Sequence, residues 1–277
     1  EKKFGYKYFN DSNLLIESSD AIAVITPTQF HYEIAMRCIE KNKHIFIEKP
    51  IAQTVLEADK IVKFSKEKKI IGQVGHVERF NPAYKAIKKI IGNPMFIESH
   101  RLAEFNPRGT DVSVVLDLMI HDIDIILSLI SSKVKNISSS GVSVISDTPD
   151  IANARIEFHN GAVANLTASR ISLKNMRKLR FFQKETYISV DLYNKNVEVV
   201  KMIDAPNKLD EFSLTLENAE GKKKQILFNS PEIINYNAIQ IELESFANSI
   251  NNDKKSIVSL EDATKALKVA YSIINSM

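Results

Sequence analysis

The stretch AIAVITPTQFHYEIAMRCIEKNKHIFIEKP, residues 21–50, decides the fold of the N-terminal part of this chain. Its two ends, AIAVIT and HIFIEKP, are short apolar runs of the kind that form buried strands. Between them, apolar residues recur at helical spacing from Ile34 to Ile39, which predicts a helix over residues 28–41. A strand, a helix and a second strand in this order predict a parallel βαβ unit.

The alternation of strands and helices continues to about residue 93. We expect a second helix over residues 53–68 and a third strand at IIGQVG, residues 70–75. Asn81 and Pro82 are typical of a helix N-cap and first turn. Gly92-Asn93-Pro94 is typical of a helix end, and we place a domain boundary there.

Residues 94–277 are predicted to form a second, α+β domain. A strand near residues 95–102 and an apolar helix near 112–130 come first, and a run of strands without helices between them follows. The expected strands lie near residues 137–145, 151–158, 163–169, 179–183, 186–193, 197–202, 212–217 and 225–228. Two closing helices are expected near residues 236–251 and 260–276. This order predicts a large, mostly antiparallel sheet.

The composition excludes several classes of protein. The 277 residues carry a formal net charge of +3, which is too small to indicate binding to nucleic acid or to a membrane surface. No apolar run approaches the roughly 20 residues of a transmembrane helix. The one cysteine, Cys38, excludes an internal disulfide framework and fits a reducing, cytoplasmic location. We expect Cys38 on the buried side of a helix.

The apolar run VVLDLMIHDIDIIL, residues 114–127, carries a polar stripe. Asp117, His121 and Asp124 fall at i, i+4 and i+7, and no Lys, Arg or Glu lies between residues 112 and 130. One interpretation is a solvent-facing stripe; the other is a stripe that lines a cleft. In a cleft, an aspartate one turn from a histidine fixes its tautomer, and the imidazole can take a proton from a hydroxyl. The third interpretation is a metal site, but no thiolate or second histidine accompanies these residues, and we expect no metal.

Polar residues also follow two of the predicted strands. Glu48 and Lys49 end HIFIEKP, and TPTQFH, residues 26–31, follows the first strand. Ligands of open α/β sheets bind at the carboxyl ends of the strands, which favours a binding site here. The alternative for HIFIEKP is a surface turn with an ordinary ion pair. The alternative for TPTQFH is a helix start with Thr28 as N-cap and His31 as a local hydrogen-bonding group.

Four motifs together resemble a known family. TPTQFH, NKHIFIEKP, GHVERFNP and DLMIHDID, in this order, are similar to the glucose–fructose oxidoreductase and inositol dehydrogenase family (Gfo/Idh/MocA), and the resemblance covers essentially the whole chain. It implies a partial Rossmann domain over residues 1–93 that binds NAD or NADP. It implies a substrate-binding and oligomerisation α+β domain over residues 94–277. The implied activity is oxidation or reduction of a sugar or cyclitol hydroxyl, by a homodimer or homotetramer, with no nucleic-acid or membrane partner.

The resemblance also implies roles for individual residues. His121 is the general base, Asp117 supports it and the substrate, and Lys49 lies by the nicotinamide and the reacting oxygen. The implied cofactor contacts are Thr26, Pro27, His31, Glu48, Lys49 and Arg79. Within the family, the sequence is most like members that act on nucleotide-linked amino sugars, UDP-N-acetylglucosamine-like, at the 3-position. The candidate substrate contacts are Asn81, Arg101, Arg108, Asp124 and Arg170. A guanidinium group suits a diphosphate, and the alternative for each arginine is an ordinary surface position.

The sequence departs from the family pattern at the cofactor fingerprint. None of the eight glycines forms a pair with the G-x-G spacing, so the turn that binds the cofactor diphosphate is absent from the printed residues. We expect roughly 50 further N-terminal residues in the native protein, from the size of a βαβ unit. Two alternatives to a dehydrogenase stay open. One is a hydrolase or lyase that uses NAD for a transient oxidation, and the other is a non-catalytic protein that binds a sugar or nucleotide.

Overall fold

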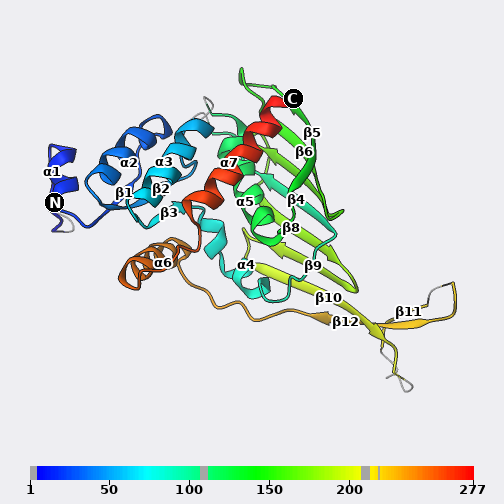
Figure 1. The fold of residues 1–277 in the computed structure, drawn as a ribbon. Helices are drawn as coiled ribbons and strands as arrows, with labels where there is room; N and C mark the ends of the chain where they lie inside the picture. Colours follow the sequence, from blue (N-terminus) through cyan, green and yellow to red (C-terminus); the bar gives the residue numbers. More distant parts are fainter. Residues whose placement is uncertain (1–4, 107–111, 207–212, 218) are drawn as a thin grey trace. The chain divides into compact units, whose positions relative to one another are not determined.

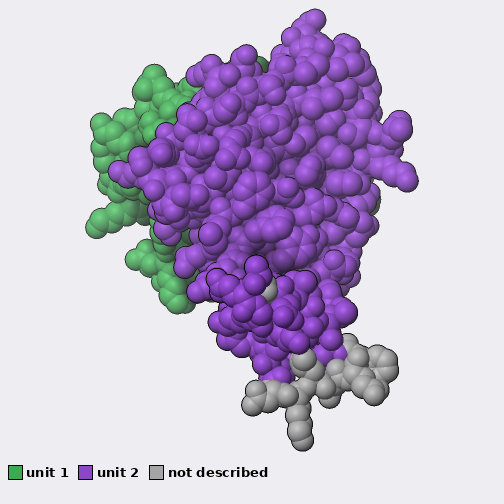
Figure 2. All heavy atoms as spheres, turned by 90° about the vertical axis from the view of Figure 1, so that its right-hand side faces the viewer, with its two compact units in different colours: residues 1–76, 239–268 green, residues 77–238, 269–277 purple. Residues whose placement is uncertain are grey.

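The computed structural model describes the whole chain except residues 1–4, 107–111, 207–212 and 218. The described residues form two compact units (Figure 2). Unit 1 lies within residues 1–76 and 239–268, and unit 2 lies within residues 77–238 and 269–277. This division by contacts differs from the predicted division at residue 93, which stays a prediction about the folding domains. Residues 82–87 group with unit 2 because their helix packs against two strands of its sheet.

Unit 1 is built on a three-stranded parallel sheet with the order β1-β2-β3. The strands are β1 (Ala21–Val24), β2 (His44–Glu48) and β3 (Gly72–Gly75). The connections are η1 (Thr28–Phe30) with α2 (His31–Glu40), and α3 (Val55–Glu67). The predicted parallel βαβ arrangement is therefore confirmed. The three central residues of β2 are at most 2% exposed, as expected for a strand that is covered on both faces.

The C-terminal part of the chain returns to complete unit 1. From α6 (Ala238–Asn251), the ring of Phe246 packs on Phe46 of β2 with 5.9 Å between ring centroids. The outer edge of β3 forms a bridge between Gln73 and Ser259, just before α7 (Leu260–Asn275). Cys38 on α2 is fully buried, as predicted, and burial raises the pKa of its thiol to about 11 although Arg37 acts in the opposite direction. A short helix, α1 (Ser12–Glu17), was not predicted.

Unit 2 is built on a nine-stranded sheet with the order β11-β12-β10-β9-β8-β4-β7-β6-β5 (Figure 1). The strands are β4 (Phe96–Leu102), β5 (Val134–Val142), β6 (Ile151–Phe158), β7 (Val163–Ser169), β8 (Met176–Gln183), β9 (Thr186–Asp191), β10 (Asn196–Asp204), β11 (Thr215–Glu217) and β12 (Lys223–Asn229). β4 runs parallel to β7, and the other described neighbours are antiparallel, which confirms the predicted mostly antiparallel sheet. The expected strand at 212–217 is observed from Thr215, and its first residue lies outside the described part of the chain.

Helices cover one face of this sheet (Figure 1). They are η2 (Val77–Phe80), α4 (Pro82–Ile87), η3 (Val115–Met119), α5 (Ile120–Leu129) and the last residues of α7. Along β6, alternate residues from Ala152 to Phe158 are buried, and the residues between them face outwards. Asn81 accepts from the Ala83 N–H as N-cap of α4, and Pro82 is in its first turn, as predicted. In the part of the chain that the structure describes, no helix is long and apolar enough to span a membrane.

Candidate active site

Glu48 and Lys49 lie where β2 ends, at the carboxyl edge of the parallel sheet. Both residues are half-buried, and the Lys49–Pro50 peptide bond is cis. The Lys49 N–H donates to Glu48 Oε2 at 3.3 Å. Thr26 and Pro27 are exposed in the turn that follows β1. These two turns therefore occupy the end of the sheet at which open α/β folds bind their ligands.

His31 connects the two turns. It is the first residue of α2 and is only 1% exposed. Its Nε2 lies 2.8 Å from the carbonyl oxygen of Thr26, and its Nδ1 lies 2.9 Å from the carbonyl oxygen of Pro50. A neutral imidazole can donate to one of these oxygens, and an imidazolium can donate to both. His31 thus holds the backbone of the two turns together, and its predicted contact with a cofactor stays a prediction.

Gly75 leaves room for the Glu48 carboxylate. The two residues are register partners in β3 and β2. A Cβ atom on Gly75 would lie 2.8 Å from Glu48 Oε2, closer than such atoms approach in folded proteins. A larger residue at position 75 would therefore push the carboxylate aside. Because Gly75 has no side chain, the Glu48 carboxylate keeps its place in the turn that carries Lys49.

The stretch 114–129 contains two kinds of helix. Residues Val115–Met119 form a π-helical turn, η3, and Ile120–Leu129 continue as the α-helix α5. The sequence predicts one α-helix here, and the widened turn corrects that expectation. Asp117 lies in the π-helical turn and His121 lies in the first turn of α5, and both are half-buried. Single π-helical turns are rare and are frequent at functional sites.

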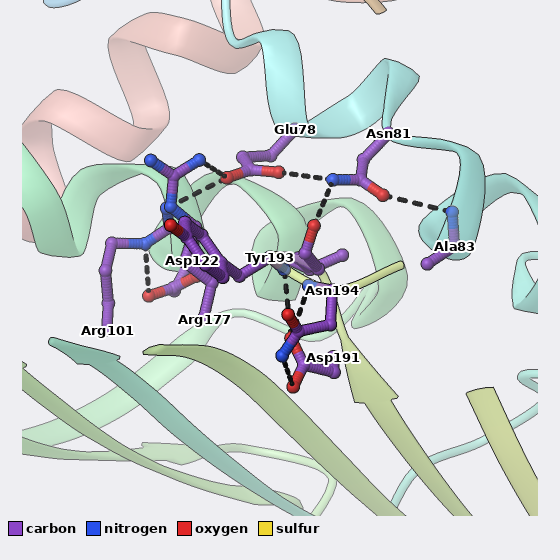
Figure 3. A network of polar contacts seen from close by, with 10 residues as sticks. Glu78, Asn81, Ala83, Arg101, Asp122, Arg177, Asp191, Tyr193 and Asn194 are labelled. Carbon is purple, nitrogen blue, oxygen red and sulfur yellow. Dashed lines mark hydrogen bonds and ion pairs between the residues drawn. The ribbon is translucent and has the colours of Figure 1, made fainter. Parts of the chain in front are cut away.

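A buried network of opposite charges joins this stretch to β4 and η2 in unit 2 (Figure 3). Arg101 on β4 donates to both carboxylate oxygens of Asp122 on α5, at 3.0 and 2.7 Å. It also donates to Glu78 Oε1 at 2.9 Å, and all three side chains are at most 4% exposed. Burial on its own would lower the pKa of Arg101, but Asp122 and Glu78 raise it above the ordinary value. The guanidinium is therefore charged and fully engaged inside unit 2.

Glu78 links this buried pair to a guanidinium that reaches solvent. Arg177 Nη1 donates to Glu78 Oε1 at 3.0 Å, and 46% of the Arg177 side chain is exposed. Asn81 Nδ2 donates to Glu78 Oε2 and to the carbonyl oxygen of Leu192, both at 3.0 Å. Burial on its own would raise the pKa of Glu78, but Arg101, Arg177 and Asn81 hold it below the usual range. With Asp122 included, two positive and two negative groups balance each other, as a buried cluster requires.

Asp124, the last residue of the predicted polar stripe, is also buried. Arg79 Nε donates to Asp124 Oδ2 at 2.7 Å, and the two side chains are 7% and 2% exposed. The stripe is therefore not one open face, because Asp124 faces the interior while Asp117 and His121 are half-buried. The predicted roles of Arg79 with a cofactor and of Asp124 with a substrate stay predictions.

Arg170 anchors the beginning of the same stretch. Its Nε donates to Asp150 Oδ1 at 2.9 Å, and its Nη1 donates to the carbonyl oxygen of Val112 at 2.6 Å. The other Asp150 oxygen accepts from three consecutive backbone N–H groups, those of residues 144, 145 and 146. Burial on its own would raise the pKa of Asp150, but these N–H groups and Arg170 hold it far below the usual range. The pair therefore fixes the loop before β6 and the backbone at Val112, three residues before η3 begins.

Every predicted substrate contact that the structure describes is buried and bonded within unit 2. These residues are Asn81, Arg101, Asp124 and Arg170. The alternative of an ordinary surface arginine is wrong for Arg101 and Arg170, which are 3% and 6% exposed. Arg108 lies outside the described residues. Among the residues that are described, no group of three or more His, Cys, Asp or Glu side chains could hold a metal ion.

Sequence reasoning missed three buried acids that organise the site, namely Glu78, Asp122 and Asp150. A signal was present for Asp122, which stands in the largely apolar run MIHDIDI, whereas Glu78 and Asp150 have polar residues close by in VERF and TPDIAN. Asp and Glu are almost never fully buried unless they are paired. An acid at an apolar position of a helix or strand therefore predicts a buried pair, although it does not identify the partner.

Comparisons with known proteins place both parts of the chain in one family. Residues 1–76 match the family model described as "Oxidoreductase family, NAD-binding Rossmann fold", and residues 84–188 match "GFO/IDH/MocA C-terminal domain". The chain is 34% identical over 192 residues to the UDP-N-acetylglucosamine 3-dehydrogenase of Acidithiobacillus ferrooxidans, which is 69% of this chain and 61% of that protein. The matched region is thus less than two thirds of that relative's length. This chain is also 28% identical over 274 residues to the scyllo-inositol 2-dehydrogenase (NAD(+)) of Bacillus subtilis, a match that covers 93% of this chain and 75% of that protein.

Solved structures agree with these matches. The UDP-N-acetylglucosamine 3-dehydrogenase from Acidithiobacillus ferrooxidans superimposes with a TM-score of 0.87 at 28% identity, covering 97% of this chain and 82% of that one. A levoglucosan dehydrogenase in complex with NADH superimposes with a TM-score of 0.79 at 20% identity, covering 96% and 80%. The second likeness concerns the fold alone.

Proposed function

The chain belongs to the Gfo/Idh/MocA family of oxidoreductases, and from this premise we propose that it oxidises a sugar hydroxyl with NAD or NADP. One observation carries the proposal. A single chain that matches both family models also holds Lys49 at the carboxyl end of β2, Asp117 in a π-helical turn and His121 just after that turn. A pure binding protein has no need for an ammonium group, a carboxylate and an imidazole in these places.

The residues divide the work of alcohol oxidation between them. Oxidation removes a hydride from the carbon and a proton from the oxygen of one hydroxyl. In the proposal, His121 accepts the proton, and Asp117, four residues earlier, orients the imidazole and stabilises its charged form. The Lys49 ammonium lowers the free-energy cost of negative charge on the reacting oxygen. When bound, the nicotinamide ring supplies the hydride-accepting chemistry that side chains lack.

The residues of unit 1 fit the nicotinamide end of such a cofactor. The turns after β1 and β2 lie at the ligand-binding edge of the sheet, and the buried His31 fixes their backbones. Thr26 and Pro27 are exposed there, and Glu48 and Lys49 are half-exposed. No glycine pair in the sequence has the G-x-G spacing, so the proposal assigns no diphosphate contact within this chain.

We extend the proposal to a nucleotide-linked amino sugar, similar to UDP-N-acetylglucosamine and oxidised at its 3-position. The support is the 34% identity to a protein named for that reaction, against 28% to an inositol dehydrogenase. The proposal gives the substrate-facing roles to Asp117 and His121. The buried Arg101 and Asp124 support the helix that carries them.

A coupled test of substrate and mechanism follows the reduced nicotinamide by absorbance. Protein expressed from its complete coding sequence is mixed with NAD or NADP and with UDP-N-acetylglucosamine, UDP-glucose or scyllo-inositol. We expect turnover with UDP-N-acetylglucosamine. The Lys49→Met variant removes the charge but keeps the length of the side chain, and we expect kcat to fall by about 10²- to 10³-fold with an unchanged melting temperature.

The matched control is Lys41→Met, which makes the same chemical change at an exposed position at the end of α2. We expect its kcat to stay within about twofold of the wild-type value, as for a surface position remote from the proposed site. Calorimetry with the cofactor alone is run in parallel. Binding of the cofactor without turnover on any of the three compounds would contradict the proposed substrate class, and full turnover by Lys49→Met would contradict the role of Lys49.

A further inference from the structure

The end of the large sheet at which β4 and β9 finish carries an arginine that is partly open to solvent, Arg177. It lies on β8, in register with Arg101 of β4. Register partners on neighbouring strands point to the same face of a sheet, so Arg177 lies on the face that the helices cover. The buried Leu179 and Phe181 of β8 lie on this face too. However, 46% of the Arg177 side chain is exposed, whereas Arg101 is 3% exposed.

Two contacts hold the guanidinium group of Arg177 in place (Figure 3). Its Nη1 donates to Glu78 Oε1 at 3.0 Å, and its Cζ lies 5.9 Å from the centroid of the Tyr193 ring. Glu78 is itself buried and bonded to Arg101, and the Tyr193 N–H donates to Asp191 Oδ1 at 3.0 Å. Because both neighbours are fixed by other bonds, Arg177 is oriented although about half of its side chain reaches solvent.

Much of the hydrogen-bonding capacity of Arg177 is not used inside unit 2. A guanidinium group carries several N–H donors in a fixed fork. In the described part of the chain, the hydrogen bonds of the Arg177 side chain use Nη1 alone. Arg101 and Arg170 differ, because each donates through Nε, Nη1 and Nη2. Of these three arginines, Arg177 is the one that can bind an anion from solvent and keep its bond within unit 2.

The buried network also fixes Arg177 relative to the proposed catalytic residues of unit 2. Arg101 donates to Asp122 on one side and to Glu78 on the other, and Arg177 donates to the same Glu78 oxygen. Asp122 follows His121 directly in α5. Two bonded side chains, Arg101 and Glu78, therefore connect the helix of the proposed base to the open guanidinium. One nucleotide sugar is long enough to reach from this helix to Arg177.

We propose that Arg177 binds the diphosphate of the substrate and thereby selects a nucleotide-linked sugar over a free sugar or a cyclitol. This inference rests on the proposed function and deepens it, because it names the residue that recognises the nucleotide end. A guanidinium group can bind two phosphate oxygens at once through parallel N–H donors. The two arginines of the sequence prediction that the structure describes, Arg101 and Arg170, are already bonded to carboxylates. A free sugar or a cyclitol has no charge for Arg177 to bind.

Titration calorimetry with UDP tests the binding of the diphosphate without requiring turnover. Protein expressed from its complete coding sequence is first saturated with NADH or NADPH, so that UDP cannot occupy the cofactor site. We expect Arg177→Gln to weaken UDP binding by about tenfold or more, the loss expected when a hydrogen bond between charged groups is removed.

The matched control is Arg180→Gln, which makes the same change on the same strand. Arg180 is also partly exposed and also paired with an acid, since its Nη1 lies 3.2 Å from Glu98 Oε2. Side chains alternate along a strand, so Arg180 lies on the opposite face of the sheet from Arg177. We expect Arg180→Gln to change the affinity for UDP by less than about twofold.

A second variant separates binding of the anion from support of the buried network. Arg177→Lys keeps the positive charge that balances Glu78 but loses the planar fork. We therefore expect the melting temperature to stay within a few degrees of wild type. The affinity for UDP should fall by about threefold or more, the equivalent of one hydrogen bond.

Initial rates give a further readout that a purely structural role would not move. In Arg177→Gln the KM for UDP-N-acetylglucosamine should rise by about tenfold or more, while kcat stays within about threefold of wild type. The reason is that the diphosphate does not react, so its contact with Arg177 is the same before and during the hydride transfer. Damage to the fold would instead lower kcat and the melting temperature together.

The inference is overturned by any of three results: no binding of UDP to the wild type up to about 10 mM, unchanged affinity for UDP in Arg177→Gln, or equal losses in Arg177→Gln and Arg180→Gln. Its failure is distinct from failure of the proposed function. Turnover of UDP-N-acetylglucosamine with an affinity for UDP that does not depend on Arg177 removes this inference alone. Binding of UDP through Arg177 without oxidation of UDP-N-acetylglucosamine supports this inference and removes the proposed reaction.

Discussion

Two groups of polar side chains lie in the same stretch, residues 114–129. They differ in burial and in whether a buried arginine balances their charge. Asp122 and Asp124 are buried, and each is bonded to a buried arginine, Arg101 or Arg79. Asp117 and His121 are half-buried, and they lie in and just after a π-helical turn. The charges of the first group are balanced inside unit 2, whereas the second group can reach a ligand.

The difference shows how one helical stretch can serve stability and chemistry together. A carboxylate that is buried and is bonded by a guanidinium on both oxygens is not open to a substrate. The ion pair instead fixes the helix, and the fixed helix holds the neighbouring half-buried residues in place. The two groups should therefore respond to substitution in opposite ways, one through stability and the other through turnover.

The largest effect is expected at His121. We expect His121→Ala to lower kcat by about 10²- to 10⁴-fold, because the general base is lost, and to leave the melting temperature within a few degrees of wild type. Initial rates and thermal unfolding measure the two quantities. The matched control is His159→Ala, at an exposed position after β6, which should keep full activity. A His121→Ala protein that is fully active would remove the proposed role of this residue.

The next effect is expected at Asp122, and it should appear in stability. Asp122→Asn leaves only Glu78 to balance both Arg101 and Arg177, so the buried cluster carries one uncompensated positive charge, and we expect a loss of about 3–5 kcal/mol in the free energy of unfolding. Denaturant titration measures it. The double variant Arg101→Met/Asp122→Leu removes both charges and should recover part of the loss. A loss below about 1 kcal/mol in Asp122→Asn, typical of an exposed pair, would show that the network contributes little.

A smaller effect is expected on the free energy of unfolding at low pH, where Glu78 becomes protonated. The pKa of Glu78 in the folded protein is below its value in the unfolded chain, which is about 4.3. Its contribution to stability is therefore complete above that value and is lost as the pH falls through the lower, folded pKa. Between about pH 5 and pH 2 the free energy of unfolding of wild type should fall more steeply than that of Glu78→Gln. The exposed Glu40→Gln is the control and should keep the wild-type slope.

The smallest effect is expected at Ser128, which is polar and uncharged and belongs to neither group. Its Oγ donates to the carbonyl oxygen of Ile125 at 2.6 Å and lies 3.1 Å from the Tyr84 hydroxyl oxygen. We expect Ser128→Ala to lower the free energy of unfolding by about 1 kcal/mol, with kcat unchanged. Denaturant titration and initial rates check this pair of values. A large fall in kcat would extend the catalytic group beyond Asp117 and His121.

Much of the fold could be predicted because its signals are local. The apolar runs and helical spacing of residues 21–50 predict β1, α2 and β2, and Asn81 with Pro82 predicts the start of α4. Each of these features depends on the chemistry of neighbouring residues. The widened turn at 115–119 has no such signal, because its apolar residues fit an α-helix equally well.

The pairing inside the site could not be predicted because its partners are distant in sequence. Arg101 meets Asp122 across 21 residues, and Asn81 meets the carbonyl of Leu192 across 111. Nothing in the local pattern selects one acid or one carbonyl among many. For the same reason the sequence identifies Arg101 and Arg170 as arginines suited to phosphate, whereas only the structure reveals that carboxylates already engage them.

The order of segments in unit 1 has a consequence for synthesis on the ribosome. The chain leaves unit 1 after His76 and returns at Ile239, about 160 residues later. At roughly 5–20 residues per second, Phe46 and the outer edge of β3 wait about 10–40 seconds for Phe246 of α6 and Ser259 to cover them. During this interval the nascent chain exposes an incomplete apolar surface, which is the kind of surface that chaperones bind.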